Sequence, residues 1–232
     1  MTVKSTDRHQ ALALLRQALA DPSAEFHADQ WEAIDALVNK RQKLLVVQRT
    51  GWGKSSVYFI ATRILRDRGM GPTLIISPLL ALMRNQMMAA DRMAINAITI
   101  NSTNTDEWPG LIETVLDNQV DVLLISPERL ANDDFVESVL RPMGNRIGLL
   151  VVDEVHCISD WGHDFRPDYR RMVNILKLMP PNMPVVGTTA TANNRVLDDA
   201  RLQLGDIVIQ RGPLMRETLS LQTLRLPDQA AR

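Results

Sequence analysis

Six short apolar runs, separated by stretches with helical periodicity, constrain the fold of this 232-residue chain more than any other feature. Most of the runs are rich in Val, Ile and Leu, which is typical of strands buried on both faces of a sheet. Strands and helices that alternate in this way imply right-handed crossovers and a mostly parallel sheet. The sequence therefore predicts an α/β fold with helices on both faces. The runs lie at 44–47, 73–76, 97–100, 122–125, 147–152 and 185–188, and helices are expected at 8–20, 28–39, 55–68, 80–92 and 111–117.

Polar residues stand at the ends of several of these runs. In an open parallel sheet, ligands bind beyond the carboxyl ends of the strands. We therefore expect these polar residues to meet at one functional edge. They are the loop at 48–55 and the pairs Ser77-Pro78, Ser126-Pro127, Asp153-Glu154 and Thr188-Thr189.

The loop after the first run is typical of a phosphate-binding loop. Its glycines let backbone N–H groups turn toward phosphate oxygens, Lys54 reaches the β- and γ-phosphates, and the Ser55 hydroxyl binds Mg²⁺. A helix beginning near Lys54 points its positive end at the same phosphates. Gln48 stands where the pattern has its first glycine, so a Gly-Lys-Ser turn that starts an ordinary helix stays open as the alternative. The other expected nucleotide contacts are Thr50, Gly51, Trp52, Gly53 and Ser56.

Two adjacent carboxylates, Asp153 and Glu154, end the fifth apolar run. Carboxylates in this position hold Mg²⁺ and orient a water in ATPases. We expect Asp153 to lie close to the metal, directly or through water, and Glu154 to act as the general base or the water-orienting group. Their combination with the loop at 48–55 favours an ATPase over a simple helix cap.

The segment that follows these carboxylates combines aromatic residues with a cation. Trp161, Phe165 and Arg166 are of the types on which single-stranded nucleic acid stacks. We expect them to sense a nucleic-acid strand, with core packing of the two aromatics as the alternative.

Together these motifs resemble the RecQ family of superfamily 2 DNA helicases, in their first RecA-like lobe. The most specific segment is 153–169, Asp-Glu-Val-His-Cys-Ile-Ser-Asp-Trp-Gly-His-Asp-Phe-Arg-Pro-Asp-Tyr, which resembles motif II and an aromatic-rich loop. The resemblance extends from about Phe26 to about Arg216, and the loop at 48–55 also resembles that of a divergent RecQ-like branch. Further segments resemble motif I (50–55), motif Ia (77–86), motif III (187–192) and two DNA-side motifs (101–103 and 126–130).

The resemblance implies a RecA-like P-loop lobe that uses ATP and Mg²⁺ to move on single-stranded DNA and unwind duplex DNA. It implies that Gln30 reads the adenine base, although His27 stands where a basic residue is usual and no aromatic precedes Phe26. It also implies that His156 bridges to Thr189 or Thr191. On the DNA side, the implied contacts include Ser77 and Asn85.

The family resemblance also implies a second RecA-like lobe that supplies arginine to a shared cleft. We expect a helical segment at 1–24, the ATP-binding lobe at 25–220 and a tail at 221–232 that leads toward that second lobe. Too few residues follow the motif III-like segment for another lobe, so this chain alone is expected to be an incomplete motor.

Composition and charge narrow the classes of function. A net charge of −1 argues against broad electrostatic capture of nucleic acid and favours a local patch. No apolar leader and no apolar run of membrane-spanning length is present, which predicts a cytoplasmic protein. Two other functions stay open, an RNA-dependent remodelling ATPase and a non-catalytic nucleotide-gated nucleic-acid-binding module. Candidates for the patch are Arg166, Arg170, Arg171 and Arg195, the last three with an ordinary solvated surface as alternative.

Overall fold

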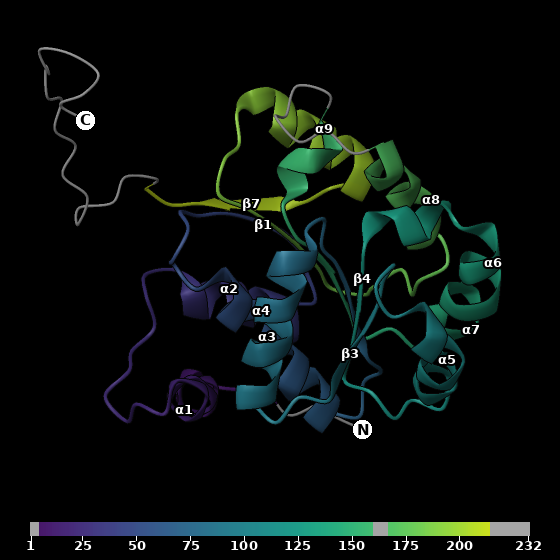
Figure 1. The fold of residues 1–232 in the computed structure, drawn as a ribbon. Coiled ribbons are helices and arrows are strands. Elements are labelled where there is room, and N and C mark those ends of the chain that lie inside the picture. The colour runs from purple at the N-terminus through teal and green to yellow at the C-terminus, as the bar shows by residue number, and fades with distance from the viewer. Residues whose placement is uncertain (1–4, 160–166, 214–232) are drawn as a thin grey trace, which may run out of the picture.

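A seven-stranded parallel sheet forms the centre of the molecule (Figure 1). The computed structural model describes residues 5–159 and 167–213. Neighbouring strands follow the order β3-β4-β2-β5-β6-β1-β7, and every pairing is parallel. The strands are β1 (Lys43–Val47), β2 (Thr73–Ile76), β3 (Ala97–Ile100), β4 (Val122–Ile125), β5 (Leu149–Val152), β6 (Val185–Thr189) and β7 (Val208–Arg211).

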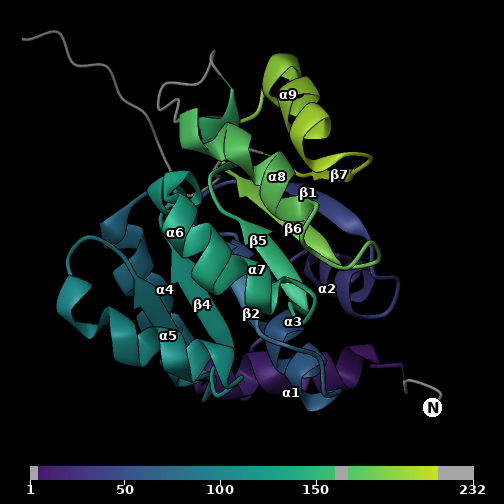
Figure 2. The same ribbon diagram turned by 90° about the vertical axis from the view of Figure 1, so that its right-hand side faces the viewer.

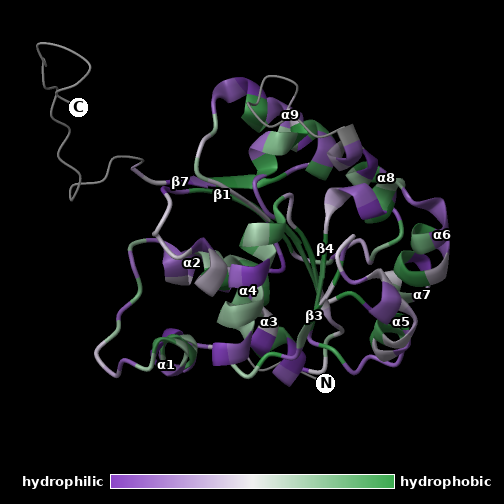
Figure 3. Ribbon diagram, viewed as in Figure 1, coloured by the Kyte–Doolittle hydropathy of each residue, from purple (hydrophilic) through white to green (hydrophobic). Residues whose placement is uncertain are grey.

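Alternating side chains of the central strands enter two separate hydrophobic clusters. Leu45 and Val47 of β1 pack into one cluster, while Leu44 and Val46 pack into the other. Because successive strand residues point to opposite faces, burial on both sides requires the continuous apolar runs that the sequence contains. Figure 3 shows the central strands in the colour of hydrophobic residues and the surrounding helices in mixed colours, as expected for helices with one buried face.

Helices cover both faces of the sheet, as Figure 2 shows. The buried residues of α1 to α4 belong to one cluster, and those of α6 to α9, with the apolar side of α5, to the other. None of the helices in the described ranges combines the length and apolar character needed to cross a bilayer. The helices are α1 (Arg8–Leu19), α2 (Gln30–Val38), α3 (Lys54–Asp67), α4 (Leu80–Arg92), α5 (Trp108–Leu116), α6 (Asp133–Phe135), α7 (Arg141–Gly144), α8 (Met172–Leu176) and α9 (Asn194–Leu204). Short 3-10 turns lie at Thr105–Glu107, Pro127–Ala131, Val155–Ile158 and Pro167–Arg171, and a π-helical turn, Val136–Leu140, joins α6 to α7.

The α/β fold predicted from the apolar runs is confirmed, with small shifts at the ends of elements. The fifth strand begins at Leu149 rather than at Ile147. The helix expected in the first 24 residues is α1, and its inner face joins the same hydrophobic cluster as α2 and α3. The short helices α6, α7 and α8, the longer helix α9 and the edge strand β7 were not predicted.

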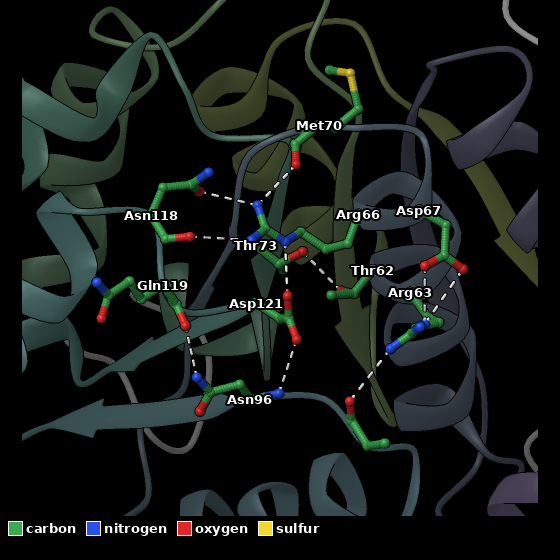
Figure 4. A network of polar contacts seen from close by, with 11 residues as sticks. Thr62, Arg63, Arg66, Asp67, Met70, Thr73, Asn96, Asn118, Gln119 and Asp121 are labelled. Carbon is green, nitrogen blue, oxygen red and sulfur yellow. Dashed lines mark hydrogen bonds and ion pairs between the residues drawn. The ribbon is translucent and has the colours of Figure 1, made fainter.

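A polar network closes the edge of the sheet at which the strands begin (Figure 4). We call it the amino-edge network and define it as Arg66, Asn96, Asn118, Gln119 and Asp121. Arg66 Nε donates to Asp121 Oδ1 at 2.8 Å, and Arg66 Nη1 donates to Asn118 Oδ1 at 3.0 Å. The second oxygen of Asp121 accepts from the Asn96 backbone N at 2.9 Å, and Asn96 Nδ2 donates to Gln119 O at 2.7 Å. The network therefore ties the end of α3 to the starts of β3 and β4.

Candidate active site

The residues expected at one functional edge do meet there. Val47 of β1 pairs with Thr189 of β6, and Ile76 of β2 pairs with Val152 of β5, so all four strands end at the same edge of the sheet, β1 and β6 two residues further along than β2 and β5. The loop 48–53 and Asp153 follow two of these ends directly. We call this side of the sheet the carboxyl edge.

Glycines shape the loop that joins β1 to α3. Gly51 and Gly53 have φ angles of +84° and +92°, left-handed values that favour glycine. A Cβ at Gly53 would lie 2.5 Å from Gln30 Nε2, so the loop also needs glycine there for space. Gly53 directly precedes the first turn of α3, whose unpaired backbone N–H groups favour a bound anion.

Gln48 does not adopt the left-handed backbone conformation that would require the glycine of the usual pattern. Its backbone N donates to Thr189 O at 3.1 Å, which continues the contact between β1 and β6. Its side chain is buried and lies against Gly212, where an added Cβ would be 2.3 Å from the Gln48 amide. The glutamine side chain that replaces the usual glycine is therefore buried against the residue that follows β7.

The Lys54 ammonium lies over the loop. Its Nζ donates to the backbone O of Gln48 at 2.8 Å and of Arg49 at 3.5 Å. Its positive charge also acts on Asp153. A cation between loop carbonyls and a buried carboxylate is suited to binding phosphate oxygens. Around it, Thr50 and Gly51 are exposed, and Ser55 and Ser56 are half-buried.

Gln30 and Trp52 tie the loop to α2. The Gln30 side chain accepts from the His27 backbone N at 2.9 Å and donates to Trp52 O at 2.7 Å. The Trp52 indole is 5% exposed and donates through Nε1 to Ala28 O at 3.1 Å. The indole, which we expected beside the nucleotide, is instead packed between loop and helix. Gln30, expected to read the base, holds the loop in this structure.

Asp153 lies at the centre of the carboxyl edge and is 7% exposed. Its Oδ1 accepts from Thr188 Oγ1 at 2.5 Å, and its Oδ2 accepts from Gln86 Nε2 at 2.7 Å. Burial, and secondarily the charge of Glu154, raise the pKa of Asp153 above its ordinary value, although the Thr188 hydroxyl, the Glu154 backbone N–H and the Lys54 charge oppose the change. The carboxylate is therefore held in place by neutral donors, and its negative charge is only partly balanced.

This arrangement fits a Mg²⁺ ion. Mg²⁺ takes oxygen ligands and is commonly held by one or two carboxylates together with substrate phosphates. Asp153 offers a carboxylate, and Ser55 offers a hydroxyl in the first turn of α3. A divalent cation would also supply positive charge beside Asp153, whose own charge is only partly balanced.

Glu154 connects the carboxyl edge to β6 through a histidine. Its φ of +50° is left-handed, which is uncommon for a residue with a side chain and typical of functional sites. Its Oε2 lies 3.2 Å from His156 Nδ1, and the same nitrogen lies 3.2 Å from Thr189 Oγ1. Contacts with the Cys157 side chain and with Glu154 raise the pKa of His156 to about 10. Thr189 Oγ1 in turn donates to Thr191 O at 2.8 Å, so the expected bridge between His156 and Thr189 is present.

The residues expected to contact DNA are placed differently from one another. Ser77 is fully buried, and its hydroxyl lies 3.4 Å from Asp153 Oδ2, so its side chain is not placed to reach a DNA phosphate as we expected. Asn85 is exposed on α4. The residues Trp161, Phe165 and Arg166 lie outside the described ranges.

Sequence reasoning gave no contact to three residues around Asp153. Thr188 and Gln86 donate to Asp153, and the Tyr58 hydroxyl accepts from Gln86 Nε2 at 3.1 Å. Thr188 was expected at this edge from its place at the end of an apolar run, but its contact with Asp153 was not predicted. Gln86 and Tyr58 stand within helices, where no local pattern separates an inward polar group from a surface one.

Comparisons with known proteins agree with this geometry. A family model for the DEAD/DEAH box helicases matches residues 27–200. The chain is 37% identical over 182 residues to ATP-dependent DNA helicase Q1 of Rattus norvegicus, covering 76% of this chain and 28% of the relative. It is 35% identical over 181 residues to ATP-dependent DNA helicase RecQ of Bacillus subtilis, covering 78% of this chain and 29% of the relative. The chain thus spans little more than a quarter of the length of these curated relatives.

A solved structure shares the fold. The crystal structure of a hypothetical ATP-dependent RNA helicase from Sulfolobus tokodaii aligns with a TM-score of 0.65 and 17% identity, covering 89% of this chain and 57% of that chain. At this identity the similarity shows the fold alone, and it supports the RecA-like architecture.

Proposed function

The chain belongs to the DEAD/DEAH box helicase family, and its relatives include RecQ helicases; from this premise we propose that it is the ATP-binding lobe of an ATP-dependent DNA helicase. The observation that carries the proposal is the convergence of Lys54, in a glycine-shaped loop, with the buried carboxylate Asp153. A DNA substrate is favoured because the relatives are named as DNA helicases.

Each residue of the carboxyl edge has a distinct role in the proposed reaction. Lys54 and the backbone N–H groups of the loop bind the phosphates of ATP. Ser55 and Asp153 would hold Mg²⁺, which when bound neutralises the developing negative charge on the phosphoryl group. Glu154 orients the attacking water and accepts its proton. His156, Thr189 and Thr191 join this base to the end of β6 and hold its carboxylate in place.

Nucleic acid would bind near the same edge. Asn85 lies on the exposed side of α4, and Trp161, Phe165 and Arg166 are the residues whose types suit stacking on single-stranded DNA. Truncating one such aromatic to alanine, as in Trp161→Ala, should reduce the stimulation of hydrolysis by DNA more than the basal rate. A fall in melting temperature with stimulation unchanged would instead identify Trp161 as a packing residue.

A second RecA-like lobe completes the proposed motor. In the related phosphoryl-transfer enzymes, an arginine brought in from outside the phosphate-binding site accelerates the reaction by about 10³–10⁵-fold. We therefore expect the 232-residue chain by itself to bind Mg-ATP weakly and to leave duplex DNA intact. Robust ATP-dependent strand separation by the purified chain would contradict the need for a second lobe.

The nucleotide site is tested directly by calorimetric titration of the chain with Mg-ATP. Lys54→Ala should weaken binding by about 10-fold or more, because charge-assisted hydrogen bonds to phosphate are lost. Lys40→Ala is the matched control, since Lys40 pairs with Asp35 at an exposed position before β1. Equal affinity of the Lys54 variant and the unchanged chain would contradict the proposed function. Comparing stimulation of hydrolysis by single-stranded DNA and by RNA then separates a DNA helicase from an RNA-dependent ATPase.

A further inference from the structure

Gln86 is a polar residue on the inward face of α4. The buried residues of this helix are Met83, Gln86 and Ala90, which are spaced as one helical stripe. Arg84 and Asn85 lie on the exposed side. An amide in an otherwise apolar stripe needs buried hydrogen-bond partners.

The Gln86 amide has two such partners, and each leads to a proposed ligand of Mg²⁺. Its Nε2 donates to Asp153 Oδ2 at 2.7 Å and to the Tyr58 hydroxyl at 3.1 Å. Tyr58 stands three residues after Ser55 on α3, so the two side chains are neighbours on the same face of that helix. The Tyr58 hydroxyl accepts from Gln86 and keeps its own hydrogen for a second hydrogen bond. One amide thus contacts Asp153 after β5 and the helical neighbour of Ser55 on α3.

Packing alone does not explain a glutamine in this place. Gln86 Oε1 is buried, and within the described residues it has no hydrogen-bond partner. A buried acceptor without a partner is unfavourable, and leucine or methionine would fill similar space without that penalty. The unpaired Oε1 occurs in the same amide whose Nε2 makes a short contact with Asp153. Unfavourable groups of this kind are expected at functional sites, where function outweighs local stability.

We propose that Gln86 is a positioning residue that orients Asp153 and, through Tyr58, Ser55 for binding of Mg²⁺ with ATP. The proposal rests on the proposed function, because it assigns Gln86 to the metal-binding part of the same site.

The test measures how binding of a fluorescent ATP analogue to the chain depends on Mg²⁺ concentration. Gln86→Leu should raise the Mg²⁺ concentration at which the enhancement of analogue binding is half-maximal. We expect an increase of about 10–100-fold, the usual range for loss of a residue that orients a metal ligand. Binding of the analogue in EDTA should stay unchanged. Met83→Leu, a buried change one turn away on the same face of α4, is the matched control and should leave the Mg²⁺ dependence unaltered. An unaltered Mg²⁺ dependence in the Gln86 variant would overturn the proposal.

Tyr58→Phe provides a second variant that keeps the ring and removes only the hydroxyl that accepts from Gln86 beside Ser55. It should raise the required Mg²⁺ concentration by a smaller factor than Gln86→Leu does. The double variant should show a smaller effect than the sum of the two single effects, because both residues belong to one chain of contacts. If the Gln86 variant does not fold, an unchanged Mg²⁺ dependence in Tyr58→Phe overturns the proposed link to Ser55. Absence of any Mg²⁺ effect in the unchanged chain would instead contradict the proposed function, and this inference with it.

Discussion

The two edges of the sheet differ in how the negative charge of a carboxylate is balanced. In the amino-edge network, Asp121 pairs with the guanidinium of Arg66 at 2.8 Å, and its second oxygen accepts from the Asn96 backbone N. At the carboxyl edge, Asp153 accepts from the neutral groups of Thr188 and Gln86, and burial raises its pKa. A paired and hydrogen-bonded charge stabilises the fold, whereas a partly balanced one is suited to binding a cation.

Backbone conformation does not separate the two edges. Glu154 at the carboxyl edge has a left-handed φ of +50°, and Asn118 of the amino-edge network has a left-handed φ of +58°. The partly balanced charge of Asp153 is therefore what distinguishes the carboxyl edge. This division predicts that substitutions at the carboxyl edge alter binding and rate, while those in the amino-edge network alter stability.

The largest expected effect is on the rate of hydrolysis. Glu154→Gln should lower the rate by about 10²–10⁴-fold, because a neutral amide cannot accept a proton from water. Mg-ATP affinity and melting temperature should stay near those of the unchanged chain. Single-turnover hydrolysis with protein in excess over ATP measures the rate even where it is slow.

The matched control for this substitution is Asp121→Asn in the amino-edge network. It makes the same chemical change at the other edge of the sheet, so it should lower stability and spare the hydrolysis rate per folded molecule. Equal rates in the Glu154 variant and the unchanged chain would remove Glu154 from the proposed reaction.

The next effect is on stability. Arg66→Met should reduce the free energy of unfolding by about 2–3 kcal/mol, because it leaves a partly buried Asp121 without its cation. Arg63→Met is the control on the same helix, since Arg63 forms an exposed pair with Asp67 and its loss should cost about 0.5 kcal/mol or less. Urea denaturation compares the two variants. A similar small loss in both would mean that the amino-edge network contributes little.

A smaller effect of opposite sign is expected at Asp153. Asp153→Asn should increase the free energy of unfolding by about 0.5–2 kcal/mol near neutral pH in EDTA, because the buried charge is removed. The folded-state pKa of Asp153 is raised, so the penalty from its charge is present above that pKa and vanishes as pH falls through the ordinary range of aspartate. The advantage of the variant should therefore shrink toward low pH. A constant difference across the pH range would show that ionisation of Asp153 is not its cause.

The strands and the carboxyl edge were predictable from the sequence, because short local patterns identify both. The apolar runs identified six of the seven strands, and the loop with Lys54 and the Asp153-Glu154 pair identified the carboxyl edge. The edge strand β7 was missed because, within the described residues, it pairs only with β1 and has just four residues, two apolar followed by two polar, none of them buried. No short pattern distinguishes such a strand from a loop.

Residues defined by tertiary contacts escaped prediction. Gln86 reads as an ordinary helical amide until α4 is packed against Asp153. Ser77 was expected to contact DNA from the family resemblance, but its hydroxyl turns inward to the same carboxylate. The direction of a single side chain at a strand end depends on partners that are distant in sequence, so the edge was predictable while the contacts within it were not.

The smallest effect we predict concerns Trp52, which belongs to the carboxyl edge but is buried like a residue of the core. Trp52→Phe keeps an aromatic ring and removes the indole N–H that donates to Ala28 O at 3.1 Å. We expect a loss of about 0.5–1.5 kcal/mol in the free energy of unfolding, the usual contribution of one hydrogen bond. ATP affinity should fall only modestly, because Gln30 still donates to Trp52 O and holds the loop. Denaturation and nucleotide titration of the same variant separate the effect on stability from the effect on affinity. A large loss of affinity with full stability would mean that the indole contacts the nucleotide. The loop would then contain both stabilising residues and residues that bind ATP.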